Sequence, residues 1–512
     1  MTIHRRRRAR AAADAAALLS RSALALFLPA AVSAGAFAQT PAPAASPQAP
    51  VAASAGATAQ APPTGTAATT VALPSPLTLA DAIRAALRLQ PDIFASQADR
   101  DAAQQRLRQA NAAYYPTVSP QFSYGRSYAN ANGRGFGAES RNGDVSLRYR
   151  IYDTGLRDAS ARSSRAGLRA SEFAESDTRQ AVVSNVATYY FSVLRNQALV
   201  RVAEAQVTRA QNTLELTRAQ VEAQVAAAKD IYQAEADLLN AQVNLLTARN
   251  NANLAQAQLK FSIGLVGGSG LTLPDVPAPT DATPTTATLA PDPAATATGG
   301  TGAGATTGPQ TPPSPATTGD EATINNYIEL AYRTRADVAR VAAGIDQNRA
   351  AVQLARINNG VLVTTDAAIG YQFAPDTGNN RQINAQVSYP LFDAGSSRAA
   401  VRAAQANQRA AELQLESLRQ QVAVNVEQTY RQLTLARASV PAAEAAQRAA
   451  QINFEAATES RREGVGNIID VITAQTQLVQ AQTNFVQAVY DFYVADSQLA
   501  RAVGQAERLL QR

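Results

Sequence analysis

The sequence contains no cysteine and no tryptophan, and its only histidine is His4. Beyond that residue, the chain has no ligands for a thiolate or imidazole metal site and no partners for a Ser-His or Cys-His nucleophile. Its carboxylates are scattered along helical surfaces, which is typical of a solvated face. We therefore expect no cofactor, no metal site and no enzymatic activity.

The sequence also lacks a long apolar run, because no stretch of about 20 apolar residues follows residue 38. The N-terminus instead has the features of a secretory signal peptide. It combines arginines between Arg5 and Arg10, a short apolar stretch at 22–34 and small residues before an expected cleavage site after Ala38. We expect residues 1–38 to be removed. Since no cysteine follows that site, we expect no N-terminal lipid anchor.

The basic charge of the chain is concentrated in this segment. The formal net charge is +6, but residues 1–38 contain six arginines and one aspartate, which leaves +1 for the remainder. No basic cluster with interleaved aromatic residues remains after residue 38, so we expect no nucleic-acid partner.

Two segments are rich in Ala, Pro, Thr and Gly and nearly free of charged and aromatic residues: 39–76 and 268–321. Such segments cannot bury enough apolar surface to order themselves, so we predict that 39–76 is disordered and that 268–321 is a low-complexity insertion. They delimit two blocks, 77–267 and 322–508. The blocks are copies of one another, since 11 of the 35 residues from Asp230 to Gly264 are identical to the residues 240 positions later.

Each copy contains a segment in which apolar and polar residues alternate, which predicts a β-hairpin at 117–152 and another at 361–392. We expect their loops at Asn130–Gly143 and Pro375–Arg381. One face of the predicted strands is apolar and carries four tyrosines that we assign to a membrane interface: Tyr124, Tyr149, Tyr371 and Tyr389. The other face is polar and includes Arg148 and Arg150, which we assign to the lumen of a barrel.

The rest of each copy is predicted to be helical. Shorter helices at Leu79–Ala113 and Ile324–Asn358 precede the hairpins, and a helix from about Gly155 to Gln224 would be roughly 100 Å long. Ala, Leu and Phe then recur at spacings of three and four from Ala234 to Leu259 and from Ala474 to Leu499. This pattern predicts coiled-coil packing, although an ordinary helix-bundle core shares most of it. Pro441 should kink or interrupt the long helix of the second copy.

Four strands are too few to close a barrel, and an open edge cannot face lipid. Two chains would give eight strands, whose side chains would nearly fill the interior, whereas three chains would give twelve strands and a water-filled lumen. We therefore expect an internally duplicated α+β membrane protein. Its four transmembrane β-strands per chain would complete a 12-stranded trimeric β-barrel on a long α-helical coiled-coil tunnel.

Three stretches carry a family resemblance: "AAYYPTVSPQFSYG" (112–125), "VSYPLFDAGSSRAAVRAAQANQRAAE" (387–412) and "GVGNIIDVITAQTQLVQAQTNFVQAVYDFYVADSQLARAVG" (464–504). With them, the chain resembles the TolC family of outer-membrane efflux and type I secretion channels over nearly all of 77–504. The resemblance implies a homotrimer in the outer membrane of a Gram-negative cell, with its helical part in the periplasm. It also implies two partners, a periplasmic adaptor (membrane fusion) protein and an inner-membrane ABC or proton-driven transporter. Without a cysteine after the signal, the chain is similar to the non-lipidated members, which include type I protein exporters.

A periplasmic coiled-coil adaptor or scaffold without a pore is the alternative, since such proteins share long heptads and few aromatic residues. It would not need two amphipathic hairpins with tyrosines on the apolar face.

Asp230 and Asp470 begin the returning helix of each copy, at the turn farthest from the hairpins. Each could cap a helix N-terminus, or the pair could form a ring of six carboxylates around a periplasmic entrance, which the resemblance also implies. Thr473 and Gly466 stand where resembling channels can carry a second aspartate and a basic residue. An arginine latch at this tip would then use Arg461 or Arg462.

Overall fold

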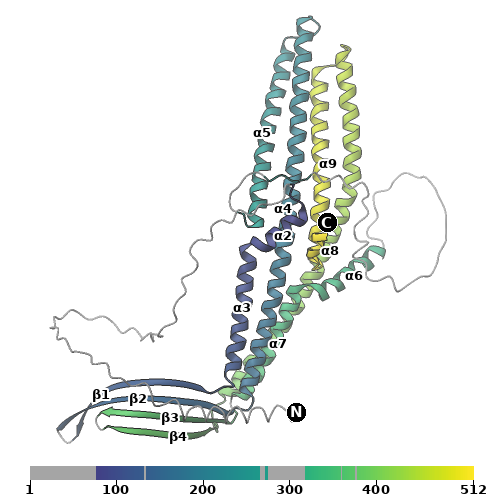
Figure 1. Ribbon diagram of the computed structural model, residues 1–512. Helices are drawn as coiled ribbons and strands as arrows, with labels where there is room; N and C mark the ends of the chain where they lie inside the picture. Colours follow the sequence, from purple (N-terminus) through teal and green to yellow (C-terminus); the bar gives the residue numbers. More distant parts are fainter. Residues whose placement is uncertain are drawn as a thin grey trace, which may run out of the picture. The chain divides into compact units, whose positions relative to one another are not determined.

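The fold repeats one order of elements twice (Figure 1). The first copy comprises α2 (Leu79–Leu89), α3 (Pro91–Ala112), β1 (Thr117–Ala131), β2 (Arg134–Tyr152), α4 (Leu156–Glu222) and α5 (Lys229–Ile263). The second comprises α6 (Thr318–Thr334), α7 (Ala336–Ile357), β3 (Leu362–Ala374), β4 (Gly378–Ser388), α8 (Ser396–Arg462) and α9 (Ile468–Ala502), followed by the 3₁₀ helix η2 (Ala506–Gln511).

This computed structural model describes residues 76–131, 134–265, 271–274, 318–358, 360–374 and 377–511. All of them belong to the unit Val71–Arg512. The expected signal peptide lies outside the described residues, as do 39–75 and most of the predicted insertion at 268–321. Two parts of that insertion are described. Helix α6 begins at Thr318, and Thr272 accepts a hydrogen bond from the backbone N–H of Leu77 through its carbonyl oxygen (2.9 Å).

The helices expected at 79–113 and 324–358 are each broken once. The break falls at Gln90 in the first copy, where Pro91 disfavours a helical conformation of the residue before it. In the second copy it falls at Arg335, which also has extended backbone angles although no proline follows. None of the described helices combines the length and the apolar content that are needed to cross a bilayer.

Helices α4 and α8 each contain 67 residues, in agreement with the long helix predicted for the first copy. Pro441 lies inside α8, and the helix is continuous through it, so an interruption is wrong and a kink stays a prediction. Proline removes one backbone hydrogen bond. The neighbouring Val440 is buried in a core cluster that holds the flanking turns in place.

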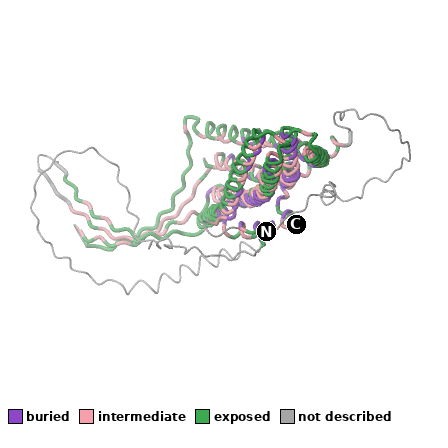
Figure 2. Tube along the Cα trace, turned by 90° about the horizontal axis from the view of Figure 1, so that it is seen from above, coloured by how far each residue is buried: buried purple, intermediate pink, exposed green. Residues whose placement is uncertain are grey.

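The long helices organise the helical part. Helix α4 contacts α3 and α7 on the side towards the sheet, and α5 and α9 beyond it; α8 contacts α7 and α9. The residues of the predicted heptads are buried or half-buried along these contacts, as expected. Buried residues are concentrated among the helices, whereas the strands are half-buried or exposed (Figure 2).

The four strands form one antiparallel sheet in the order β1-β2-β3-β4, so the β2–β3 pairing joins the two copies. The hairpin turns are tighter than the sequence indicated. Ala131 pairs with Arg134, so that most of the expected loop Asn130–Gly143 is strand, and β4 ends at Ser388 rather than near residue 392. Within the described residues, β1 and β4 each pair with one neighbour only.

Equivalent glycines fix the junction between the short and long helices of each copy. Gly264 ends α5 with φ 88°, and a Cβ atom there would lie 2.7 Å from the carbonyl oxygen of Leu89, at the α2–α3 break. Gly504 follows α9 with φ 77°, and a Cβ atom there would lie 2.9 Å from the backbone nitrogen of Arg335, at the α6–α7 break.

We predict that Gly264→Ala and Gly504→Ala each lower the free energy of unfolding by at least about 2 kcal/mol, because both combine left-handed strain with a backbone clash. The matched control is Gly344→Ala within α7, where a Cβ atom meets nothing within 4 Å. It should stabilise by about 0.5–1 kcal/mol. Denaturant unfolding followed by circular dichroism measures all three, and equal effects would contradict this account.

Candidate functional site

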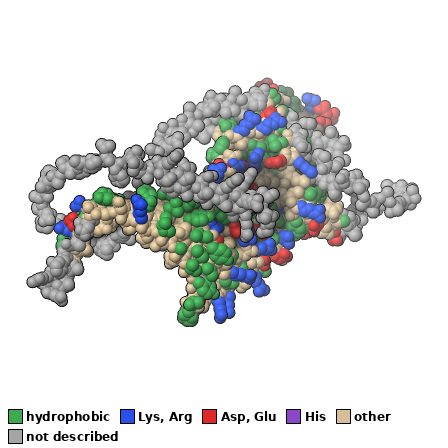
Figure 3. All heavy atoms as spheres, turned by 60° about the horizontal axis from the view of Figure 1, so that its bottom comes forward, with side chains coloured by type: hydrophobic (Ala, Val, Ile, Leu, Met, Phe, Trp, Pro, Cys, Tyr) green, Lys and Arg blue, Asp and Glu red, His purple; other side chains and the backbone are tan. Residues whose placement is uncertain are grey.

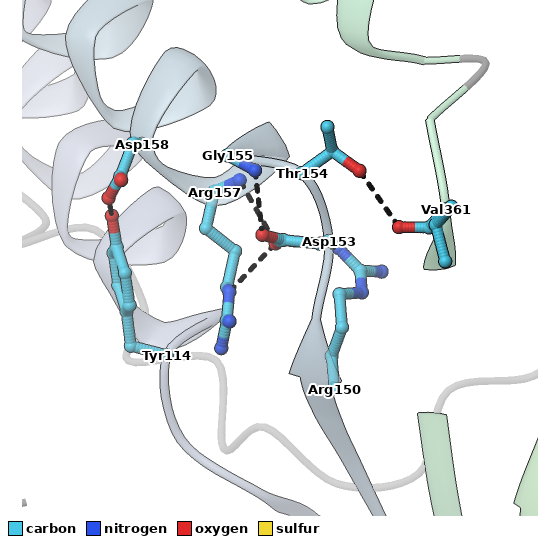
Figure 4. Close-up of polar contacts among 8 residues, drawn as sticks. All are labelled: Tyr114, Arg150, Asp153, Thr154, Gly155, Arg157, Asp158 and Val361. Carbon is cyan, nitrogen blue, oxygen red and sulfur yellow. Dashed lines mark hydrogen bonds and ion pairs between the residues drawn. The ribbon is translucent and has the colours of Figure 1, made fainter. Parts of the chain in front are cut away.

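The corner between β2 and α4 fixes the direction in which the long helix leaves the sheet (Figure 4). One carboxylate oxygen of Asp153 accepts from the backbone N–H of Gly155 (3.2 Å), and the other accepts from the backbone N–H (3.2 Å) and the guanidinium (2.8 Å) of Arg157. Thr154 and Gly155 both have left-handed backbone angles, with φ of 54° and 95°. The Thr154 hydroxyl donates to the carbonyl oxygen of Val361 (2.9 Å), which ties this corner to the start of β3.

The second copy builds the same corner between β4 and α8. Asp393 accepts from the backbone N–H groups of Gly395 (3.0 Å) and Ser397 (2.8 Å), and these bonds lower the pKa of its carboxyl group. Ala394 and Gly395 repeat the left-handed pair, with φ of 52° and 85°. Both long helices are therefore started by an aspartate that accepts backbone hydrogen bonds.

The sheet has one apolar face, because the register aligns the apolar residues of all four strands. Val118, Leu147, Ala367 and Ile383 lie side by side across it. The four predicted interface tyrosines belong to this face: Tyr124 and Tyr371 lie towards the hairpin turns, while Tyr149 lies near the helical end and Tyr389 just beyond the end of β4. Tyr124, Tyr371 and Tyr389 are exposed, and Tyr149 is half-buried.

The opposite face is polar. It carries Arg148 and Arg150, and Arg148 forms an ion pair with Asp366 on the neighbouring strand (2.6 Å). This cross-strand pair, which links the two copies, had not been anticipated, although the aspartate is visible in the alternating pattern of β3.

The tips of the two helical hairpins, at residues 223–228 and 463–467, lie at the opposite ends of α4 and α8 from the sheet. Gly464 follows α8 with a left-handed φ of 82°, and Gln224 takes the same conformation after α4, with φ 62°. The side-chain amide of Gln220 donates to the carbonyl oxygen of Arg461 (3.1 Å), so the two tips are in contact.

Asp230 and Arg461 form an ion pair between the two copies at this end. The Nη2–Oδ2 distance is 3.1 Å, and the two side chains are only 12% and 13% exposed. Arg461 also donates to the carbonyl oxygen of Gly466 (3.3 Å). Asp230 is in the first turn of α5, but that helix has no side-chain cap, so capping is not the role of Asp230.

Asp470 and Arg462 are in different environments. Asp470 is exposed and makes no ion pair with any described residue. The cap of α9 is Asn467, whose side chain accepts from the backbone N–H of Ile469 (3.3 Å). Arg462 pairs with Glu459 on its own helix (3.0 Å), and both side chains are exposed. Of the two latch candidates, only Arg461 bridges the copies.

A second polar contact lies behind the tip and was missed by sequence reasoning. The amide of Gln475 on α9 donates to Asp237 on α5 (3.0 Å), and the Gln475 side chain is fully buried. The two residues are not at equivalent positions of the repeat, so the duplication gave no sign that they would meet. Burial raises the pKa of Asp237, and the hydrogen bond from Gln475 opposes part of that shift. Among the described residues, no group of acidic or histidine side chains is arranged to hold a metal ion.

The pKa of Asp237 is raised above its unfolded value of 3.8. As the pH rises from 3.8 through the folded-state pKa, the buried carboxyl group ionises and the free energy of unfolding falls. We predict that Asp237→Asn raises the thermal unfolding midpoint at pH 7 more than at pH 4, because asparagine is neutral and still accepts from Gln475. Glu235→Gln, at an exposed position of the same helix, is the control and should change neither value. An equal effect of Asp237→Asn at both pH values would contradict the prediction.

Comparison with known proteins identifies the family. The model of the outer membrane efflux protein family matches residues 82–265 and 327–505, one segment in each copy. The outer membrane protein TolC of Escherichia coli is 25% identical over 435 residues, which cover 81% of this chain and 79% of TolC. Protein CyaE of Bordetella pertussis is 26% identical over 438 residues, covering 81% and 83%.

The solved structure of the outer membrane protein VceC from Vibrio cholerae superimposes with a TM-score of 0.64 at 19% identity, covering 83% of this chain and 96% of VceC. The fold is therefore that of the outer membrane protein VceC. The chain belongs to the outer membrane efflux protein family.

Proposed function

We propose that three copies of this chain form an outer-membrane channel-tunnel that serves as the exit duct for type I protein secretion, small-molecule efflux, or both. The observation that carries the proposal is the four-stranded sheet, which is apolar on one face, polar on the other, and open at β1 and β4. In a membrane, the unpaired backbone groups of these edges need partners, and other copies of the chain can supply them.

Three copies fit this sheet better than two. Eight strands would leave an interior that side chains nearly fill, whereas twelve leave a lumen for the polar face with Arg148 and Arg150. Tyr124 and Tyr371 would then contact one membrane interface, and Tyr149 and Tyr389 the other.

The helices support the same assembly through the internal duplication. Helix α5 exposes an apolar stripe at spacings of three, four, seven and eight residues: Tyr232, Leu239, Val243, Leu246, Leu254 and Phe261. At the equivalent positions of α9, Ile472, Val486 and Val494 pack against core clusters that include residues of the first copy. By analogy, the α5 stripe would pack against the second repeat of a neighbouring chain.

The duplication also predicts the strand register between chains. The pair Val118–Leu147 of the first hairpin corresponds to Val363–Val387 of the second. Within the chain, Arg148 of β2 is opposite Asp366 of β3. In the repeat, Arg148 corresponds to Ser388 of β4, and Asp366 corresponds to Gln121 of β1. Where β4 of one chain pairs with β1 of the next, Ser388 should therefore be opposite Gln121, and Val387 opposite Phe122.

We predict that the double variants Ser388→Cys/Gln121→Cys and Val387→Cys/Phe122→Cys yield disulfide-linked trimers under oxidation, because opposed residues meet the Cα separation of a disulfide. The chain contains no other cysteine, and the two positions lie at opposite edges of one sheet, so a link reports contact between chains. Val387→Cys/Tyr124→Cys is two residues out of register and should link poorly. Covalent dimers alone, or preferential linking of the shifted pair, would contradict the proposal.

The Asp230–Arg461 pair is proposed to hold the periplasmic entrance closed. It is a largely buried ion pair that joins the tips of the two copies, and such pairs are costly to break by removing one partner. Asp470, exposed at the same end, would contribute a ring of three carboxylates that attracts cations.

We predict that Arg461→Ala increases single-channel conductance in planar bilayers severalfold, because it frees the tip of α8 from α5. Arg462→Ala removes an equal charge from the same tip and should leave conductance within about 20%, since an exposed pair contributes little. Intact trimers with unchanged conductance for Arg461→Ala would exclude the latch.

The partners in this proposal are those that the family resemblance implies. The proposal includes a periplasmic adaptor and an inner-membrane ABC or proton-driven transporter, with the helical part in the periplasm. The alternative of a scaffold without a pore is disfavoured by the family match and by the apolar sheet face, which a soluble scaffold would leave exposed to water.

A further inference from the structure

A shallow cavity of about 370 Å³, open to solvent, lies between α7 and α8, close to the corner where β4 leads into α8. Its polar lining consists of Arg356, Ser397, Arg398, Arg402 and Gln405. None of the three arginines forms an ion pair with a described residue. Backbone N–H bonds from Ser397 and Gly395 lower the pKa of the nearby Asp393, and the charge of Arg398 acts in the same direction. The lining therefore contains three guanidinium groups and no carboxylate.

The equivalent place in the first copy has different side chains. There, Asp158 occupies the position of Arg398, and the hydroxyl of Tyr114 donates to it (Figure 4). The guanidinium of Arg157 lies 5.2 Å from the centre of the Tyr114 ring. The first copy thus pairs an acidic residue with its own tyrosine at this place, and the second copy has a basic opening there.

The basic opening should remain accessible after assembly. Helix α4 already has neighbours on both sides, α3 and α7, and yet Asp158 and Arg162 remain exposed on it. These two residues are the counterparts of Arg398 and Arg402. In an assembly, a neighbouring chain would pack against α8 in the way that α7 packs against α4. That packing would leave Arg398 and Arg402 exposed, as it leaves Asp158 and Arg162 exposed on α4.

Large apolar side chains lie next to the cavity in the sequence. Tyr389, Leu391 and Phe392, between β4 and α8, are 57%, 90% and 87% exposed. Figure 3, with the sheet end of the molecule brought forward, shows hydrophobic side chains gathered at that end with basic side chains beside them. Exposed aromatic and aliphatic side chains next to unpaired arginines suit the boundary between the acyl chains and the headgroups of a lipid leaflet.

We propose that this cavity binds the phosphate of an anionic phospholipid headgroup, with the lipid's acyl chains against Leu391 and Phe392. Guanidinium groups bind phosphate oxygens through paired hydrogen bonds. A bound phosphate would also offset the repulsion among the three positive charges. The inference rests on the proposed insertion of the sheet into a membrane, which puts the corner at the leaflet nearest the helices.

The test measures phosphatidylglycerol bound per chain by the full-length protein in detergent, using native mass spectrometry over a lipid titration. The triple variant Arg356→Gln/Arg398→Gln/Arg402→Gln should bind at least fivefold more weakly. Arg398→Asp, which restores the acidic residue of the first copy, should weaken binding as well. The control Arg162→Gln/Arg165→Gln/Arg169→Gln removes three exposed arginines from α4 and should bind as the unaltered protein does.

Three results would overturn the proposal: equal binding by the triple variant and the unaltered protein, equal binding of neutral phosphatidylcholine, or displacement of the lipid by an equal concentration of inorganic phosphate. The last result would indicate a site for free anions instead. The mass of the same particles reports the number of chains. Trimers that bind lipid equally in all variants would remove this inference and leave the proposed channel standing.

Discussion

The pairing of β2 with β3 is the interaction on which the rest of the structure depends. It is a backbone ladder between two copies of one duplicated unit, and it aligns the apolar residues of four strands on a single face. It also positions α4 beside α7, because the two helices continue from the paired strands. The same ladder leaves β1 and β4 unpaired on one side within the described residues, and these edges carry the backbone groups that an assembly has to satisfy.

The two copies share their framework and differ at their ends. Both start a long helix with an aspartate and a left-handed pair of residues, and both close the helix junction with a glycine that a larger residue could not replace. At the tip, Asp230 is held by Arg461 while Asp470 is exposed. At the corner, Asp158 is bonded to Tyr114 while its counterpart is Arg398 in an open cavity. The two copies therefore keep the same backbone geometry at the corners and junctions, while their side chains differ at the tip and at the corner.

Much of this fold could be predicted from the sequence, because the patterns that fix it are local and occur twice. Period-two alternation predicted the hairpins, and spacings of three and four predicted the buried residues of α5 and α9. The loop at Asn130–Gly143 was predicted wrongly because its glycines and asparagines are turn formers. In the sheet they are opposite Tyr128 and its neighbours, and cross-strand pairing outweighs the local preference. Pro441 does not interrupt α8 either, since the neighbouring Val440 packs into a core cluster and so offsets one lost hydrogen bond.

The site was harder to predict, because its contacts join residues that are far apart in the sequence and not equivalent in the repeat. Asp230, Arg461 and Arg462 were all candidates, but only the structure distinguishes the arginine that reaches the aspartate. Gln475 with Asp237 and the arginines around Arg398 were not anticipated, since each set joins side chains of two helices that are far apart in the sequence.

The most direct test of the central claim is the molar mass of the purified protein in detergent, measured by light scattering with the detergent contribution subtracted. The account predicts a single species containing three chains, because four strands per chain leave two edges that only a closed ring of chains can pair. A stable particle of one or two chains, or a protein that remains monodisperse in water without detergent, would contradict it.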